Sequence, residues 1–154
     1  MSYSPITVAN YFIKKYSENG QLTPMKLIKL TYIANGWYMA ISKSNSKLIE
    51  EDAQAWDFGP VYTSLYNCLK KYGSSIIKEP IVNNTNEIIS DLDATFLDRI
   101  WQIYGDKDGV YLSAITHTDG TPWSITYPKG FNLTIPSDLI LQHYKSKIKV
   151  PQNG

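Results

Sequence analysis

A segment from residue 23 to about residue 44 constrains the fold most, because it is apolar on almost every side of a helical wheel. It opens with Thr23 and Pro24, an N-cap residue followed by the helical position where the missing N–H of proline has no cost. Over residues 23–38 only Lys26, Lys29 and Asn35 interrupt its apolar surface. A helix with so little polar surface needs other parts of the chain to cover it. We therefore predict a central, largely buried helix.

Gly36 lies inside this predicted helix, where glycine is less favourable than alanine by roughly 0.5–1 kcal/mol. A glycine at such a position usually admits the close approach of another backbone or of an aromatic ring. We expect a neighbouring element to contact the helix at Gly36.

A second informative segment runs from an extended stretch, residues 54–56, through a turn into a predicted helix. The stretch ends in the aromatic residues Trp56 and Phe58, and the chain turns at Gly59. Pro60 then suits the first position of a new helix, which we predict over residues 60–71.

Capping residues and helical periodicity predict helices through most of the remaining chain. The first helix starts at Ser4-Pro5 and stops at Asn19-Gly20, and the others cover residues 91–104, 110–116, 121–127 and 136–149. Short edge-like strands are predicted at residues 76–77 and 87–89, around Pro80. No linker divides the chain. We expect a single, mainly α domain over residues 1–154, compact, with a central buried helix and at most a small β hairpin.

The charge of the chain argues against a sequence-specific DNA reader. Its formal net charge is +1, and Arg99 is the only arginine, although arginine is favoured for reading base edges and clamping phosphates. No run of about 18 apolar residues predicts a membrane-spanning helix. The single Cys68 excludes an intramolecular disulfide and fits a reducing compartment, so we expect a cytoplasmic protein with no membrane partner.

No catalytic or metal-binding motif is present in the sequence. Cys68 with either His117 or His143 could form half of a nucleophilic site, but Cys68 lies on the apolar stripe of its predicted helix, where cysteine usually packs as a small hydrophobe. Phosphate-binding glycine patterns and zinc-ligand spacings are missing. We expect no enzyme activity, no cofactor and no metal. His117, at a predicted helix end, suits a structural role that caps carbonyls or holds a loop.

Aromatic and lysine side chains are the candidates for binding a partner. Tyrosine and tryptophan are enriched at binding hot spots but are also ordinary core residues. Two interpretations of Lys26 and Lys29 stay open. In the first, their aliphatic stems follow the edge of the core while the ammonium groups reach water. In the second, the two lysines flank a surface that presents Tyr32 or Trp37 to a partner. The aromatic candidates for that partner surface are Tyr32, Trp37, Tyr62 and Tyr66.

Three separated phrases of the sequence resemble one known family. The first contains Pro24-Met25-Lys26-Leu27, Lys29-Leu30, Tyr32 and Trp37; the second contains Ala55-Trp56, Gly59-Pro60-Val61 and Tyr66; the third contains Thr116-His117 and Pro122-Trp123. Over roughly residues 5–145, the chain is similar to the Panacea domain family, which includes the SocA-like antitoxins and the phage-associated GepA-type proteins. The resemblance marks Trp56, Gly59, Pro60, His117, Pro122 and Trp123 as motif residues.

The resemblance implies a helical antitoxin whose partner is a cognate toxin, neutralised by direct binding. Some family members instead deliver the toxin to a protease, so an adaptor role stays open. One alternative is a small nucleic-acid-binding regulator, which the lysine-rich N-terminal half and Lys145, Lys147 and Lys149 favour. Another is a phage-encoded protein that binds a host partner.

Overall fold

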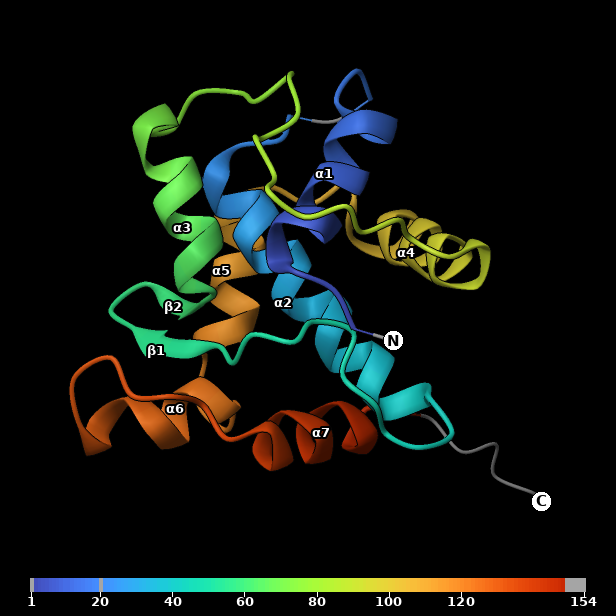
Figure 1. The fold of residues 1–154 in the computed structure, drawn as a ribbon. Helices are drawn as coiled ribbons and strands as arrows, with labels where there is room; N and C mark the ends of the chain where they lie inside the picture. Colours follow the sequence, from blue (N-terminus) through green and yellow to red (C-terminus); the bar gives the residue numbers. More distant parts are fainter. Residues whose placement is uncertain (1, 20, 149–154) are drawn as a thin grey trace.

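The chain folds into helices arranged around one central helix, α2 (Figure 1). The computed structural model describes residues 2–19 and 21–148; the predicted helix stop at Gly20 and the basic residue Lys149 lie outside them. The helices are α1 (Pro5–Tyr16), α2 (Pro24–Ile41), α3 (Thr63–Leu69), α4 (Asp91–Tyr104), α5 (Gly109–His117), α6 (Pro122–Thr126) and α7 (Ser137–Ser146), with short 3-10 turns at Lys70–Tyr72 and Tyr127–Lys129. The prediction of a mainly α fold is confirmed.

The central helix α2 forms as its sequence predicts. The side chain of Thr23 accepts a hydrogen bond from the backbone N–H of Lys26, and Pro24 occupies the first turn. Every residue from 26 to 36 is buried. Helices α1, α3, α4, α5 and α7 all pack against α2, so the predicted central buried helix is confirmed. Among the described residues, no helix is both long and apolar enough to cross a membrane.

The small β structure is a hairpin of β1 (Gln54–Trp56) and β2 (Gly59–Val61). Its antiparallel register pairs Trp56 with Gly59 across a two-residue turn. The predicted helix start at Pro60 was wrong: Pro60 lies in β2, and α3 begins three residues later. The fixed φ of proline suits a short edge strand as well as a helix start, and in this structure Pro60 occupies an edge strand.

The hairpin is closed on its other side by a later segment. The backbone N–H of Ala55 donates to the carbonyl of Leu133, and that of Ile135 donates to the carbonyl of Ala53, both at 2.8 Å. These bonds cover the outer edge of β1, which would otherwise present unpaired backbone groups. The hairpin is therefore held between the body of helices and the loop that precedes α7.

The segment between α3 and α4 contains no strand, so the strands predicted at residues 76–77 and 87–89 were wrong. Its backbone groups bond to α1 and its neighbours instead. The Asn10 side chain bonds both the N–H and the carbonyl of Ile81, at 2.7 and 2.8 Å, and the N–H of Ile77 donates to the carbonyl of Leu22 at 2.8 Å. The Asn10 side chain and the Leu22 carbonyl thus provide the hydrogen-bond partners that a neighbouring strand would otherwise supply.

The expected close approach at Gly36 is confirmed. A Cβ atom added at Gly36 would overlap three ring carbons of Tyr144 in α7. Tyr144 is buried and also packs edge-on against the ring of Trp37, with centroids 5.3 Å apart. Gly36 is therefore the position at which α7 seats on α2.

We expect Gly36→Ala to destabilise the protein, although alanine is the better helix former. Forcing an extra carbon into a packed core costs about 1–3 kcal/mol, which outweighs a helix-propensity gain of roughly 0.5–1 kcal/mol. Urea denaturation of the two proteins would measure the difference.

The double variant with Tyr144→Ala isolates the cause of this loss. If the clash is responsible, Gly36→Ala should destabilise the Tyr144→Ala background much less than the wild type. Equal losses in both backgrounds would contradict the packing argument.

Candidate functional site

Three helices donate side-chain hydrogen bonds to the carbonyls of the hairpin turn. The Lys29 amino group of α2 donates to the carbonyl of Pro60 at 2.9 Å. The Ser113 hydroxyl of α5 donates to the carbonyl of Phe58 at 3.0 Å. The Trp123 indole N–H, from α6, donates to the carbonyl of Trp56 at 2.6 Å. We call this set of bonds the turn clamp.

Gly59 and His117 complete the turn clamp. Gly59 has φ of 110°, which favours glycine, and a Cβ there would lie 2.9 Å from the Lys29 amino nitrogen and 3.4 Å from His117 Nδ1. The imidazole of His117 packs edge-on against the ring of Trp123, with centroids 5.2 Å apart, and its Nδ1 lies 3.4 Å from the hydroxyl of Ser113. His117 thus lies at the end of α5 against the turn, as a residue that holds a loop would.

The motif residues of the third phrase also start a helix. Thr121 accepts a hydrogen bond from the backbone N–H of Ser124 at 3.2 Å, and Pro122 occupies the first turn of α6. This cap directs the half-buried Trp123 toward β1. Of the six motif residues, three therefore belong to the hairpin, and the other three contact it or position a residue that does.

Lys29 is buried beside the turn with a carbonyl as its hydrogen-bond partner. The residue is only 4% exposed, so of the two open interpretations the one in which its ammonium group reaches water does not hold for Lys29. Burial lowers the pKa of Lys29 from 10.5 to about 7, because a charged group is poorly stabilised away from water.

Lys26 is buried as well, so the interpretation in which its ammonium group reaches water does not hold for it either. Its amino group donates to the carbonyl of Gly105 at 2.6 Å and lies 4.9 Å from the ring centroid of Trp101. Burial lowers the pKa of Lys26, and the nearby carboxylates of Asp106 and Asp108 oppose that shift. Lys26 therefore joins α2 to the end of α4, away from the turn clamp.

Most of the aromatic candidates for partner binding lie in or against the core. Tyr32 and Tyr62 are each 1% exposed, so Tyr62, for which the sequence left core and partner surface both open, lies in the core. Burial raises the pKa of both phenols. Trp37 is half-buried and donates to the hydroxyl of Tyr104 at 2.8 Å. Tyr66 is the candidate that reaches the surface, at 36% exposure, and it packs edge-on against Trp56.

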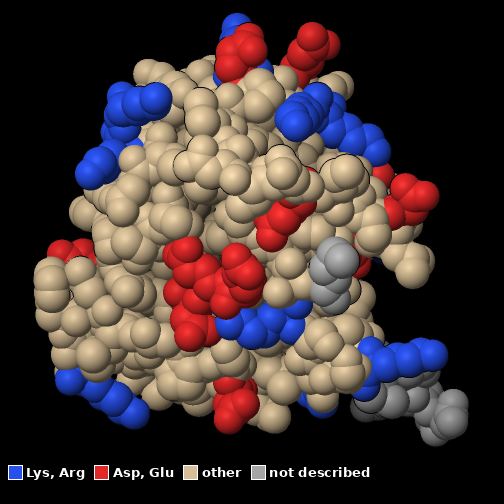
Figure 2. Space-filling model, in the orientation of Figure 1, with Lys and Arg blue, Asp and Glu red and all other residues tan. Residues whose placement is uncertain are grey.

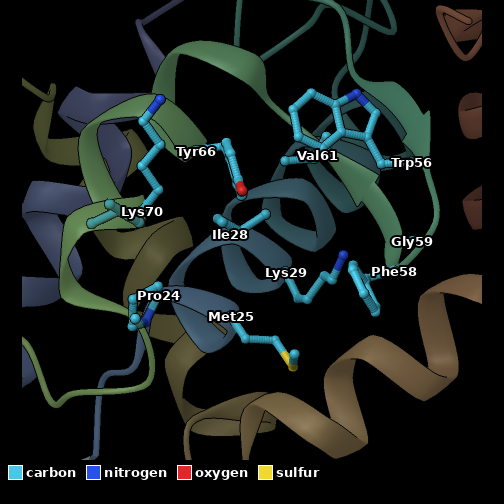
Figure 3. Close-up of a pocket in the computed structure, with 12 residues that line it drawn as sticks. Pro24, Met25, Ile28, Lys29, Trp56, Phe58, Gly59, Val61, Tyr66 and Lys70 are labelled. Carbon is cyan, nitrogen blue, oxygen red and sulfur yellow. The ribbon is translucent and has the colours of Figure 1, made fainter. Parts of the chain in front are cut away.

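Tyr66 lines a pocket beside the hairpin, which we call the hairpin pocket (Figure 3). Its volume is about 250 Å³. The walls come from the start of α2, the hairpin and α3, and the lining residues are Pro24, Met25, Ile28, Lys29, Trp56, Phe58, Gly59, Val61, Tyr66, Leu69, Lys70 and Gly73. The turn clamp and the hairpin pocket share Lys29 and the turn itself.

Two rim residues of the hairpin pocket were missed by sequence reasoning. Phe58 is 75% exposed and Met25 is 38% exposed. For Phe58 the missed signal was an apolar residue in a two-residue turn, where polar residues and glycine dominate. An aromatic side chain held in water by a braced turn is available for contact with another molecule.

Comparisons with known proteins identify one family and one similar protein. The family described as "Antitoxin SocA-like, Panacea domain" matches residues 27–124, which contain the whole turn clamp. The chain is also similar to the protein named Antitoxin SocA of Caulobacter vibrioides (strain NA1000 / CB15N), with 27% identity over 128 residues, 77% of this chain and 67% of that protein. No solved structure matches the chain significantly.

Replacing Lys29 by methionine should change how stability depends on pH. Below about pH 7 Lys29 is protonated in both the folded and the unfolded chain, so its full burial cost is present. Between pH 7 and 10.5 the unfolded chain binds more protons, so this cost falls by up to about 1.4 kcal/mol per pH unit as the pH rises. The free energy of unfolding of the wild type should therefore rise relative to Lys29→Met from pH 7 to 9.

Urea denaturation at several pH values measures this difference. Lys70→Met removes the same charge from an exposed residue of the pocket rim and is the matched control. If the free energies of unfolding of the wild type and of Lys29→Met differ by a constant amount from pH 7 to 9, burial does not lower the pKa of Lys29.

Proposed function

We propose that this chain, which belongs to the SocA-like antitoxin family with a Panacea domain, is an antitoxin that neutralises a cognate toxin by direct protein–protein binding. The observation that carries the proposal is the exposed apolar rim of the hairpin pocket, held on a turn that three helices brace. The relative named Antitoxin SocA supports the same role.

A braced apolar surface is suited to binding a protein. Rigid aromatic side chains bury large areas with few torsions to restrict, so they contribute strongly to protein interfaces. The turn clamp orders Phe58 before any partner arrives, which lowers the entropic cost of association. We therefore infer a binding role without catalysis, and a cytoplasmic site of action remains our prediction.

Charge favours a protein partner over nucleic acid. On the face shown in Figure 2, charged side chains form small, separate groups with broad uncharged areas between them. Two lysines that favoured nucleic-acid binding, Lys145 and Lys147, lie near the end of α7, and the third, Lys149, lies outside the described residues. Loss of any DNA binding between low and moderate salt would identify such binding as non-specific.

Co-expression with the product of the adjacent gene tests the antitoxin role. We expect that gene alone to arrest growth, and this chain to restore growth and to co-purify with the toxin in a stable complex. Growth arrest that persists with both proteins folded, or a neighbour that is harmless when expressed alone, would contradict the proposal.

The amount of toxin in the rescued cells distinguishes direct neutralisation from delivery to a protease. Direct neutralisation leaves the toxin present at full level and bound to the antitoxin. An adaptor would instead lower the toxin level, and deletion of the responsible protease would restore it. If this protein restores growth but does not bind the product of the adjacent gene, a host protein would be favoured as its partner.

A further inference from the structure

We propose that the hairpin pocket receives an acidic, apolar segment of the cognate toxin, whose bulky apolar side chain enters the pocket while an adjacent carboxylate pairs with Lys29. The inference rests on the proposed antitoxin function and names the chemistry of the toxin segment. It is carried by the shape of the hairpin pocket, by the charge inside it and by the exposed rim around it.

The size and walls of the hairpin pocket fit a side chain. Ile28, Val61 and Leu69 line it with aliphatic carbon, and Trp56 and Tyr66 add two aromatic rings. Its volume of about 250 Å³ lies below the range of roughly 300–1,000 Å³ typical of sites for drug-sized ligands and cofactors. One large apolar side chain entering from a partner would fill such a space.

The charge at the hairpin pocket specifies an anion. Its charged lining residues are Lys29 and Lys70, and no acidic side chain is among them within the described part of the chain. Figure 3 shows Lys29 extending toward Phe58 and Gly59, with Lys70 on the opposite side of the view. The Lys29 amino group has one carbonyl partner in the turn clamp, although an ammonium group has three donors.

The groups that face Lys29 do not neutralise it. From α5 the imidazole of His117 lies near the same turn, and across the hairpin pocket α3 presents the phenol of Tyr66. The carboxylate of Asp57, a residue of the hairpin turn, accepts a hydrogen bond from the hydroxyl of Tyr127 at 2.7 Å. A carboxylate supplied by a partner would satisfy the free donors of Lys29 and favour its charged form.

The rim supplies the area that such a segment would cover. Met25, Phe58 and Tyr66 are exposed around the hairpin pocket and come from α2, the hairpin turn and α3 respectively. Covering these side chains would remove apolar surface from water and exclude water from the Lys29 pair. The first effect favours association, and the second strengthens the electrostatic attraction between Lys29 and the carboxylate.

Calorimetric titration with toxin recovered from the co-purified complex tests the apolar part of the proposal. We expect Met25→Glu and Phe58→Ala to weaken toxin binding tenfold or more, while their circular dichroism matches the wild type. Leu92→Glu and Phe131→Ala make the same kinds of change at apolar residues that are more exposed and lie outside the hairpin pocket, and these variants should bind within threefold of the wild type.

Proton uptake tests the carboxylate part and separates it from a structural role of Lys29. At pH 8.5 the free protein holds Lys29 mainly neutral, because burial lowers its pKa to about 7. Pairing with a carboxylate would recharge it, so binding should take up close to one proton. Titration in two buffers of different ionisation enthalpy measures this number, and Lys29→Met should abolish the uptake.

Each other outcome would overturn a stated part of the inference. Wild-type toxin affinity in Met25→Glu and Phe58→Ala would place the interface elsewhere and leave the antitoxin function standing. If these two variants bind toxin more weakly but the wild type takes up no proton on binding, pairing of Lys29 with a carboxylate would be ruled out. A chain that dimerises through this surface alone, with Met25→Glu monomeric, would make a second copy the occupant. Failure of wild-type protein to bind or neutralise the toxin would overturn the proposed function itself.

Discussion

The hydrogen bonds that three helices donate to carbonyls in and beside one two-residue turn hold the hairpin in place. Lys29 lies far along the sequence from Ser113 and Trp123, and each of the three bonds a different carbonyl between residues 56 and 60. A two-stranded hairpin has little stability by itself. Its conformation here therefore depends on α2, α5 and α6 being in place, and a change in any of these helices would reach the exposed Phe58.

The turn clamp includes an unfavourable element, the burial of an amine without an acidic partner. An amine at the Lys29 position satisfies the carbonyl of Pro60 but loses most of its contact with water. An apolar residue would fill the same space with no cost of burying a charge. Pairing with the anionic partner that we propose would relieve this unfavourable burial, and it would account for a lysine at this position.

The helices could be predicted because their signals are local. Ser4-Pro5, Thr23-Pro24 and Thr121-Pro122 each cap or start a helix directly after them in the chain, and the structure contains all three helices. The second strand of the hairpin was misassigned because Pro60 suits either a helix start or an edge strand, and the choice depends on pairing with β1. Phe58 was missed, and Tyr62 was left open between core and partner surface, for a related reason: sequence periodicity across an irregular turn does not indicate which side chains face the core.

The sequence by itself determined that α2 is the buried centre of a mainly helical domain, since a helix that is apolar on nearly every side can be stable only when covered. It also marked Lys29, Gly59, His117 and Trp123 of the turn clamp, without showing what they bind, but it did not mark Ser113. Only the tertiary structure decided that these residues meet at one turn, that Lys29 is buried beside a pocket, and that Phe58 stands exposed. The physical reason is that burial and hydrogen-bond partners at this site come from contacts between residues far apart in the chain, which no local pattern encodes.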